Sequence, residues 1–304
     1  MKVTLLGPQR RPTLEGVVAA LYPEGPVATI TAGWQEREGD DAELGRLLGS
    51  RDVNLRLHAR WLDVQERDPE FAAGERRLAG LLGELQDLYL LRLDHALQAV
   101  YAVARRGGDR LRPGVLAEAI ETVRELDAAH LLRAGALRGE FYQGLAPHDR
   151  AVIAGHRAEV AGLLGDAAAL VMAGGHVGVL ADALHLFNVA AALRCPVIAW
   201  SAGAMALAER IVLFHDRSAH GPGHPEIFGS GLSVLHGAVP LPHARARLLL
   251  DDTPRMAVFA RRFAPARCVL LENGTRLDVG SDGDFPPGAR VLATDGHVTT
   301  LEAA

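Results

Sequence analysis

Short, mainly apolar runs constrain the fold of this chain more than any other feature of its sequence. Such runs lie at residues 3–6, 27–31, 53–57, 168–172 and 196–200. A strand that is buried on both faces has a continuous apolar sequence, and parallel sheets consist of such strands. Helical or polar stretches separate the runs, at residues 14–21, 36–48, 152–164 and 180–193. This alternation predicts an α/β fold with a mostly parallel sheet sandwiched by helices.

The pattern changes between residues 63 and 149. Leu78, Leu81, Leu85 and Leu88 recur at helical spacing, and no β-type alternation occurs in this stretch. We therefore expect a helical insertion within a single α/β domain that spans residues 1–304. The insertion would be an antiparallel helix pair, packed on the sheet or on a partner subunit. A homo-oligomer that forms through the insertion is compatible with this pattern.

The composition excludes several classes of protein. The net charge is −5 in 304 residues, which argues against a nucleic-acid partner or an anionic membrane surface. No apolar segment reaches the roughly 20 residues that a membrane-spanning helix needs. Cys195 and Cys268 have neither zinc nor disulfide spacing, and we expect buried free thiols. The first residues resemble a core strand and not a signal peptide, so we expect a cytoplasmic protein. We also expect neither a metal nor a cofactor.

A strand that runs directly into a helix at Ser201 is the most informative local pattern. Such a turn strains the backbone of the residue at its tip, and small residues two positions before and after are then required. Ala199 and Gly203 occupy those positions. The turn would expose the Ser201 hydroxyl at the carboxyl edge of the sheet and leave the Ala202 N–H available to an oxyanion. The alternative is that Ser201 is only the N-cap of the following helix.

A second glycine turn follows the apolar run at residues 168–172. Gly174 and Gly175 allow the backbone to approach a tetrahedral intermediate closely, so this turn is expected to supply a second oxyanion donor. A plain turn or a phosphate-binding loop is the alternative, although the spacing is not GxGxxG.

A serine nucleophile needs a general base, and the base needs an acid that orients it. His243 is our candidate base, because prolines flank it in a loop after the apolar run at residues 232–235. His236 is the alternative. Asp216, at the end of an expected strand, is the candidate acid. Three other acids remain open: Asp251, Asp252 and Glu272.

The loop at residues 214–226 contains three histidines and two acids, which could suggest a metal site. These residues lack the helical HExxH arrangement and any fixed ligand spacing. We interpret the segment as an active-site loop that carries the acid.

Three segments together resemble a known family. They are W-S-A-G-A-M around Ser201, the glycine turn at residues 173–176, and G-L-S-V-L-H-G-A-V-P-L-P-H-A-R further on. They are similar to the dipeptidase E and cyanophycinase family of serine peptidases, which have the class I glutamine-amidotransferase-like fold. The resemblance is weak over residues 1–60 and good over residues 150–300.

The resemblance implies roles for individual residues. Ser201 would be the nucleophile, His243 the general base, and Gly175 and Ala202 the oxyanion-hole donors. The dipeptidase branch implies Asp216 as the acid, whereas the cyanophycinase branch has a glutamate.

Two features depart from the family pattern. The glycine turn reads A-G-G-H, which would place His176 near the substrate, so the family's substrate specificity does not carry over. The helical insertion is also absent from the pattern.

The sequence therefore predicts a serine peptidase or amidohydrolase that acts on a small peptide or amide through an acyl-enzyme. Arg245 or Arg217 could anchor a substrate carboxylate. Two alternatives remain: an α/β-hydrolase-type esterase, and a catalytically inactive amidotransferase-like domain that binds a metabolite or partner. Only 42 residues separate Ser201 from His243, which disfavours the esterase.

Overall fold

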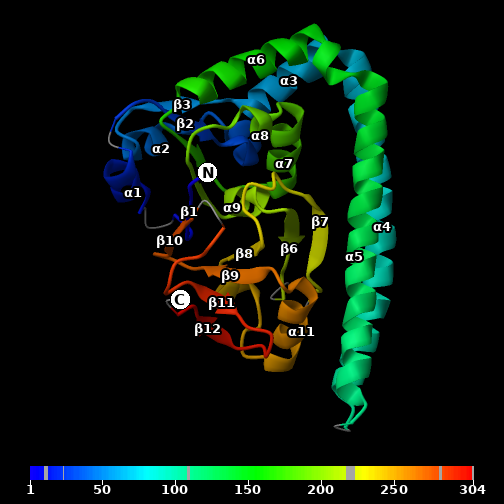
Figure 1. Ribbon diagram of the computed structural model, residues 1–304. Helices are drawn as coiled ribbons and strands as arrows, with labels where there is room; N and C mark the ends of the chain where they lie inside the picture. The colour runs from blue at the N-terminus through cyan, green and yellow to red at the C-terminus, as the bar shows by residue number, and fades with distance from the viewer. Residues whose placement is uncertain (10–12, 23, 108–109, 217–222, 281–282, 303–304) are drawn as a thin grey trace.

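A six-stranded sheet forms the centre of the computed structural model, which describes residues 1–9, 13–22, 24–107, 110–216, 223–280 and 283–302 (Figure 1). The strand order is β10-β1-β5-β4-β2-β3. The strands are β1 (Val3–Leu6), β2 (Val27–Ile30), β3 (Asp52–Asn54), β4 (Ala169–Met172), β5 (Val197–Trp200) and β10 (Arg276–Val279). Only β10 pairs antiparallel, with β1. Strands β1, β2, β4 and β5 are buried at every position, as their continuous apolar sequences require.

Short helices cover the central sheet, so the expected α/β sandwich is confirmed. These are α1 (Leu14–Leu21), the 3-10 helix η1 (Ala32–Arg37), α2 (Ala42–Leu47), α3 (Leu57–Arg67), η2 (Pro147–Asp149), α6 (Ala151–Asp166), α7 (Val177–Leu186), α8 (Val189–Ala192) and α9 (Ala202–Leu207). Two boundaries differ from the sequence expectation. The third strand ends at Asn54, before α3 begins. The helix expected at residues 180–193 is broken at Asn188, whose φ of 52° is left-handed.

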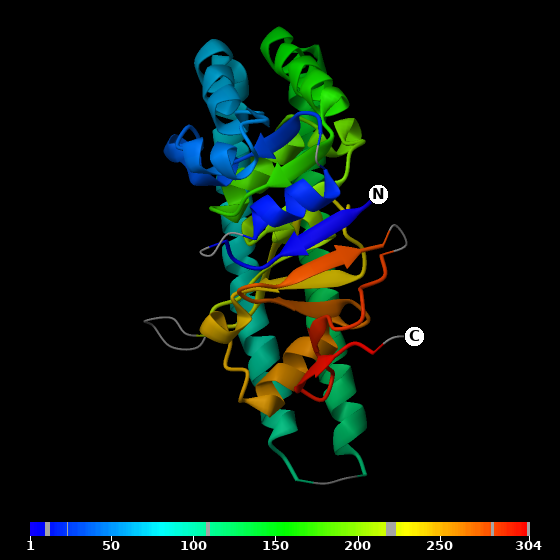
Figure 2. The same cartoon turned by 90° about the vertical axis from the view of Figure 1, so that its left-hand side faces the viewer.

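Two smaller sheets lie beside the central one (Figure 2). The first has the order β12-β11-β9-β8, with β8 (Ala238–Pro242), β9 (Arg267–Leu271), β11 (Arg290–Leu292) and β12 (Val298–Thr300). The second pairs β6 (Arg210–Leu213) with β7 (Glu226–Ser230). Helices α10 (Ala244–Arg247) and α11 (Thr253–Phe263) follow β8.

The prolines before His243 lie in a strand, although the sequence analysis placed them in a loop. Pro240 and Pro242 belong to β8, which is an edge strand of its sheet. Proline lacks an N–H donor, and an edge strand has one side on which no donor is needed. The apolar run at residues 231–235 forms no strand; Leu235 makes only an isolated bridge to Ala208.

The predicted insertion is a long antiparallel hairpin of α4 (Pro69–Ala104) and α5 (Arg112–Leu145) (Figure 1). It stands beside the smaller sheets and packs on α11 and β7, not on the central sheet as the sequence analysis allowed. Residue 63, where we expected the insertion to begin, lies inside α3. Among the described residues, no helix is both long and apolar enough to cross a membrane.

Candidate active site

A cavity of about 560 Å³ lies at the carboxyl ends of four neighbouring strands of the central sheet. Pro8 and Gln9 follow β1, Trp34 follows β2, Gly175 follows β4, and Ser201 follows β5 directly. Open α/β sheets bind ligands at this edge, because the loops after the parallel strands converge there. The fold therefore places the serine turn and the glycine turn at one cavity.

Ser201 has the strained backbone that the sequence predicts. Its φ of 51° and ψ of −124° lie outside the regions that L-residues normally adopt. The residue stands at the N-cap position of α9, yet its side chain forms no cap hydrogen bond. Its carbonyl instead accepts from the N–H of Met205, at 3.1 Å. The hydroxyl is thus not used as an N-cap, which was the alternative explanation for this serine.

The small residues around the serine are required by close backbone contacts. A Cβ on Gly203 would lie 2.5 Å from the Met172 carbonyl oxygen, at the end of β4. A Cβ on Gly174 would lie 2.8 Å from the Cβ of Ser201. Both distances are shorter than van der Waals contact, so the glycine turn lies directly against the serine.

The glycine turn is anchored to the loop after β2. The N–H of His176 donates to the carbonyl of Gly33 at 2.7 Å. Gly175 has a φ of +118°, a conformation that favours glycine. Among the described residues, its own N–H has no backbone acceptor. The Ala202 N–H lies in the first turn of α9, where no intrahelical acceptor exists. Neither N–H group proposed for the oxyanion hole thus has a backbone acceptor in the described part of the chain.

His243 lines the same cavity as Ser201, although it comes from the second sheet. It follows β8 directly and has a left-handed backbone, with φ of 56° and ψ of 35°. Its N–H donates to the Leu271 carbonyl at the end of the neighbouring strand β9, at 3.1 Å. Its carbonyl accepts from the N–H of Ala246 and Arg247 in α10. These bonds fix the backbone that carries the imidazole.

Asp216 is buried, with an exposed fraction of 3%, and interacts with the segment that follows His243. Arg255 donates to its Oδ1 at 2.6 Å, and the N–H of Leu249 donates to its Oδ2 at 3.1 Å. Its own N–H donates to the carbonyl of Arg247. The carboxylate thus neutralises an arginine and holds the chain just after α10.

The other acids considered from the sequence lie in three different places. Glu272 Oε1 accepts from the N–H of Arg245, two residues after His243, at 2.7 Å. Asp252 accepts from the N–H of Arg255 as the N-cap of α11. Asp251 lines a separate cavity. The alternative base, His236, lies 3.4 Å from Glu209 and does not line the Ser201 cavity.

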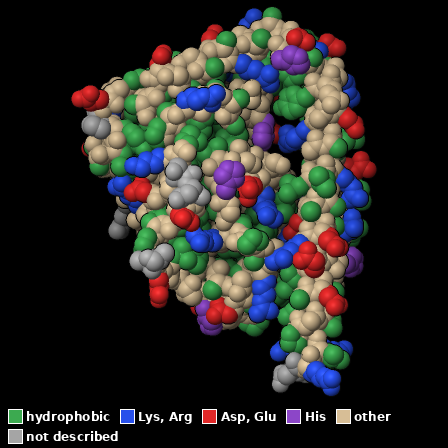
Figure 3. Space-filling model, viewed as in Figure 1, with side chains coloured by type: hydrophobic (Ala, Val, Ile, Leu, Met, Phe, Trp, Pro, Cys, Tyr) green, Lys and Arg blue, Asp and Glu red, His purple; other side chains and the backbone are tan. Residues whose placement is uncertain are grey.

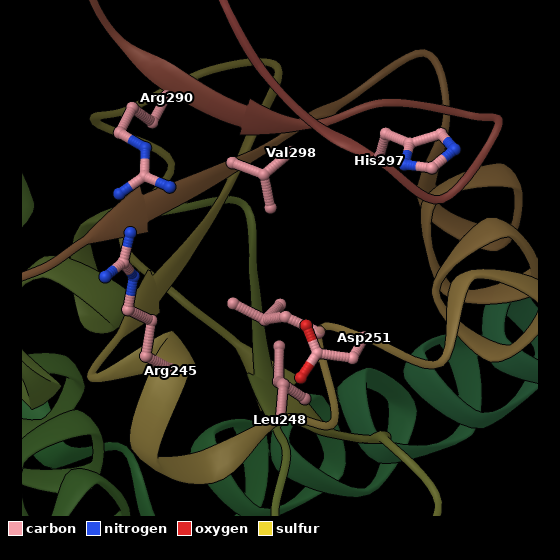
Figure 4. A pocket seen from close by; sticks show the side chains of 7 residues that line it. Arg245, Leu248, Asp251, Arg290, His297 and Val298 are labelled. Carbon is pink, nitrogen blue, oxygen red and sulfur yellow. The ribbon is translucent and has the colours of Figure 1, made fainter.

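The two residues expected to bind substrate do not line the Ser201 cavity. The Nδ1 of His176 accepts from the N–H of Val179, so this ring caps α7. Arg245 lines a second cavity of about 430 Å³, where its guanidinium faces that of Arg290 across the opening (Figure 4). Arg217 lies outside the described residues.

Gln9 and Trp34 also line the Ser201 cavity, and neither was predicted from the sequence. Each follows a central strand at its carboxyl end, after β1 and β2. Their position after a parallel strand is the signal that could have identified them.

The described part of the chain contains no cluster of three or more histidines, cysteines or acids arranged to hold a metal ion. Residues 217–222 of the loop considered for a metal lie outside that part. Cys195 and Cys268 are both free and buried, as expected.

Comparison with known proteins finds matches among solved structures only. No protein-family model matches the chain, and no curated protein matches it. The crystal structure of a peptidase from an acI-B1 Actinobacterium is 15% identical in sequence, with a TM-score of 0.48. The likeness covers 99% of this chain and 94% of that one.

Proposed function

We propose that this protein is a serine hydrolase that cleaves a small peptide or amide through an acyl-enzyme. The observation that carries the proposal is the strained backbone of Ser201, in a cavity that His243 also lines. Strain of this kind persists only where the surrounding structure enforces it, and it is concentrated at functional sites. A serine at such a strand-to-helix turn is typical of nucleophiles.

In the proposed reaction, His243 takes the proton from the Ser201 hydroxyl as the oxygen attacks the substrate carbonyl. The N–H groups of Gly175 and Ala202 donate to the oxyanion that forms. His243 then gives the proton to the leaving amine, and the acyl-enzyme remains. Water attacks the acyl group with the same help from His243, which releases the acid and restores Ser201.

The acid of the proposed triad is Asp216, with Glu272 as the alternative. Asp216 supports the chain just after α10, the helix that follows His243, through the N–H of Leu249. Glu272 contacts that helix at the N–H of Arg245. The substitutions Asp216→Asn and Glu272→Gln distinguish the two. The true acid is the one whose amide lowers kcat about 10⁴-fold in a variant that is still folded at the assay temperature.

The nucleophile itself is tested with a fluorophosphonate probe, which reacts only with an activated serine. The wild-type chain should be labelled, and both Ser201→Ala and His243→Ala should lose labelling. Ser233→Ala is the matched control, because Ser233 also has a positive φ, of 52°, but is absent from the cavity lining.

A folded wild-type chain that is not labelled would contradict the proposal and favour an inactive binding domain. Labelling that persists in Ser201→Ala would show that another residue reacts. If Ser201 is labelled, hydrolysis of amides and of simple esters should be compared, because an esterase would cleave only the esters.

A further inference from the structure

A third cavity, of about 330 Å³, lies where the hairpin meets the central domain. Its walls come from η1, α3, α7, the first part of α4 and the last part of α5, near the upper end of the hairpin in Figure 1. It shares no lining residue with the Ser201 cavity. Helix η1 separates this cavity from the Ser201 cavity, because Trp34 lines the Ser201 cavity and the next residue, Gln35, lines this one.

The third cavity contains a carboxylate, that of Glu75, which forms no salt bridge among the described residues. Glu75 Oε2 accepts from the indole N–H of Trp61 at 2.8 Å and from the amide of Gln65 at 2.6 Å. Among the described residues, no group bonds to Oε1 and none forms a salt bridge with Glu75. The nearby Arg138 is paired with Asp182, at 2.9 Å. Burial raises the pKa of Glu75, which reflects how poorly the charged form is solvated there.

A buried histidine beside this carboxylate also lacks partners. His58 has an exposed fraction of 6%, and neither ring nitrogen has a hydrogen-bond partner among the described residues. Unsatisfied polar atoms in a protein interior are rare and costly. The His58 ring stacks on Trp61, with 5.5 Å between the ring centroids. A polar group in the cavity would give the imidazole a partner.

Aromatic side chains complete the wall. Phe141 and Tyr142 of α5 line the cavity, with their ring centroids 5.4 Å apart, and Trp61 lines it from α3. Aromatic faces attract cations as well as apolar groups, most strongly where water is excluded. We propose that this cavity binds a small organic ammonium ion, whose charged group bonds to Glu75 Oε1 and whose apolar body packs against these rings.

Titration with phenethylamine tests this proposal, with 2-phenylethanol as the uncharged control of the same shape. Binding is followed by calorimetry and by the NMR signal of the Trp61 indole N–H. The amine should bind to the wild-type chain and the alcohol at least about tenfold more weakly. Glu75→Gln should weaken binding of the amine about 10- to 100-fold, because a charge-assisted hydrogen bond is lost.

Glu66→Gln is the matched control, because Glu66 is an exposed acid of α3 outside the cavity and its removal should leave binding unchanged. Ala79→Phe should abolish binding by filling the cavity while Glu75 remains. Equal binding of the amine and the alcohol, no binding of the amine, or unchanged binding in a folded Glu75→Gln variant would each overturn the proposal.

A free amine and the amino terminus of a peptide have the same ammonium chemistry. Phenethylamine and phenylalanyl-glycinamide distinguish these sources, because only the second carries the start of a peptide. Tighter binding of the dipeptide amide would identify a peptide terminus, and tighter binding of phenethylamine a free amine. This inference does not depend on the activity of Ser201.

A separate observation concerns the outer face of α4. Leu81, Leu88 and Leu91 are 50%, 54% and 59% exposed on this face. The opposite face of the same helix buries Tyr89 and Leu93 against the domain. Charged side chains of both signs lie along the hairpin (Figure 3). Leucines exposed to this extent at helical spacing are typical of a helix–helix interface.

Two pairs of polar residues on this face are arranged symmetrically about the point between Tyr89 and Leu90. Asp87 and Arg92 lie at equal distances from it along the chain, and so do Glu84 and His95. Leu88 and Leu91 lie between them. In an antiparallel pair of α4 helices, each acid would therefore face a basic residue of the other copy, and the leucines would meet. We infer that a second copy of this chain docks on this face.

Light scattering over a concentration series tests the dimer. Asp87→Arg places like charges opposite each other and should raise the dimer dissociation constant at least about tenfold. Adding Arg92→Asp in the same chain should restore the dimer, because the pair is reversed in both copies. Asp149→Arg, an exposed site outside α4, is the control. A wild-type chain that stays monomeric throughout the series, or a double variant no tighter than the single one, would refute this face as the interface.

Discussion

The serine turn depends on how closely two backbones can approach at single residues. Ser201 occupies its strained conformation because α9 begins immediately after β5. Gly203 lets α9 lie against the end of β4, which also carries the glycine turn. Because Gly203 has no side chain, the proposed nucleophile and the proposed oxyanion donors can lie next to each other.

Gly203→Ala should therefore disturb both stability and reactivity. The new methyl group would lie 2.5 Å from the Met172 carbonyl oxygen, so the backbone must shift. We expect a loss of about 1–3 kcal/mol in unfolding free energy and slower fluorophosphonate labelling. Denaturant titration and labelling rates measure the two effects. Gly135→Ala, in α5 with open space around it, should instead stabilise by about 0.5–1 kcal/mol.

The buried imidazole of His130 gives a prediction about pH. Burial lowers the pKa of His130 below its ordinary value of 6.5, and its ring stacks on Tyr89 at 4.2 Å. As the pH falls, the unfolded chain therefore takes up this proton before the folded chain does. Unfolding free energy should decrease as the pH falls below about 6.5, and the decrease should be smaller in His130→Phe.

Chemical denaturation between about pH 7 and pH 5 measures this effect of His130. His148→Phe is the control, because the His148 side chain is 70% exposed. An identical pH dependence in His130→Phe and the wild-type chain would refute the assignment.

The hairpin is joined to the domain by one buried polar network. Arg262 of α11 donates twice to the carboxylate of Asp127 in α5, both times at 2.7 Å. Tyr89 of α4 donates to Asp127 and accepts from Arg262 and from the N–H of Ile227 in β7. Asp127 and Arg262 are 2% and 3% exposed. Four elements thus share one charge pair in which each polar group has a partner.

Asp127→Ala should strongly destabilise the protein. The guanidinium of Arg262 would remain buried without its counter-charge, which costs about 3–5 kcal/mol. Equilibrium unfolding in denaturant measures the change. Arg67→Ala, which breaks an exposed i,i+4 pair with Asp63, should cost less than about 0.5 kcal/mol. A loss of similar size in both variants would contradict the importance of burial.

On the scale of the whole molecule, the proposed active site joins two sheets. Ser201 and the glycine turn belong to the central sheet, whereas His243 belongs to the sheet that contains β8. Helix α9 packs on β8 and so connects them. The serine and the histidine can act together only while both sheets remain folded against each other.

Cysteine labelling tests whether the two sheets unfold as one domain. Cys195 precedes β5 of the central sheet, and Cys268 lies in β9 of the second. Burial raises the pKa of both thiols, that of Cys268 to about 12, so neither should react with iodoacetamide in the native protein. If the chain is a single domain, both thiols become reactive at the same denaturant concentration. Separate transitions, followed by mass spectrometry, would indicate two domains.

Patterns confined to a few residues were predictable from the sequence. The apolar runs that form β1, β2, β4 and β5 were recognised because strands buried on both faces need apolar side chains at every position. The turn at Ser201 was recognised because its strain requires small neighbours within two residues. The hairpin was recognised because its leucines recur every three or four residues, as on one side of a helix. Only the tertiary structure showed that Leu81 and Leu88 of this set are exposed.

The tertiary structure alone decided which distant residues meet. Asp216 pairs with Arg255, 39 residues away, and Asp127 pairs with Arg262, 135 residues away. Trp34 lines the same cavity as Ser201, which lies 167 residues further along the chain. The residues next to a charged side chain in the sequence do not indicate which distant residue becomes its partner. Its partner is set by how sheets and helices pack, and the same packing placed the hairpin beside β7 and α11. The local sequence thus determined the elements and the serine turn, and long-range packing determined the surroundings in which they act.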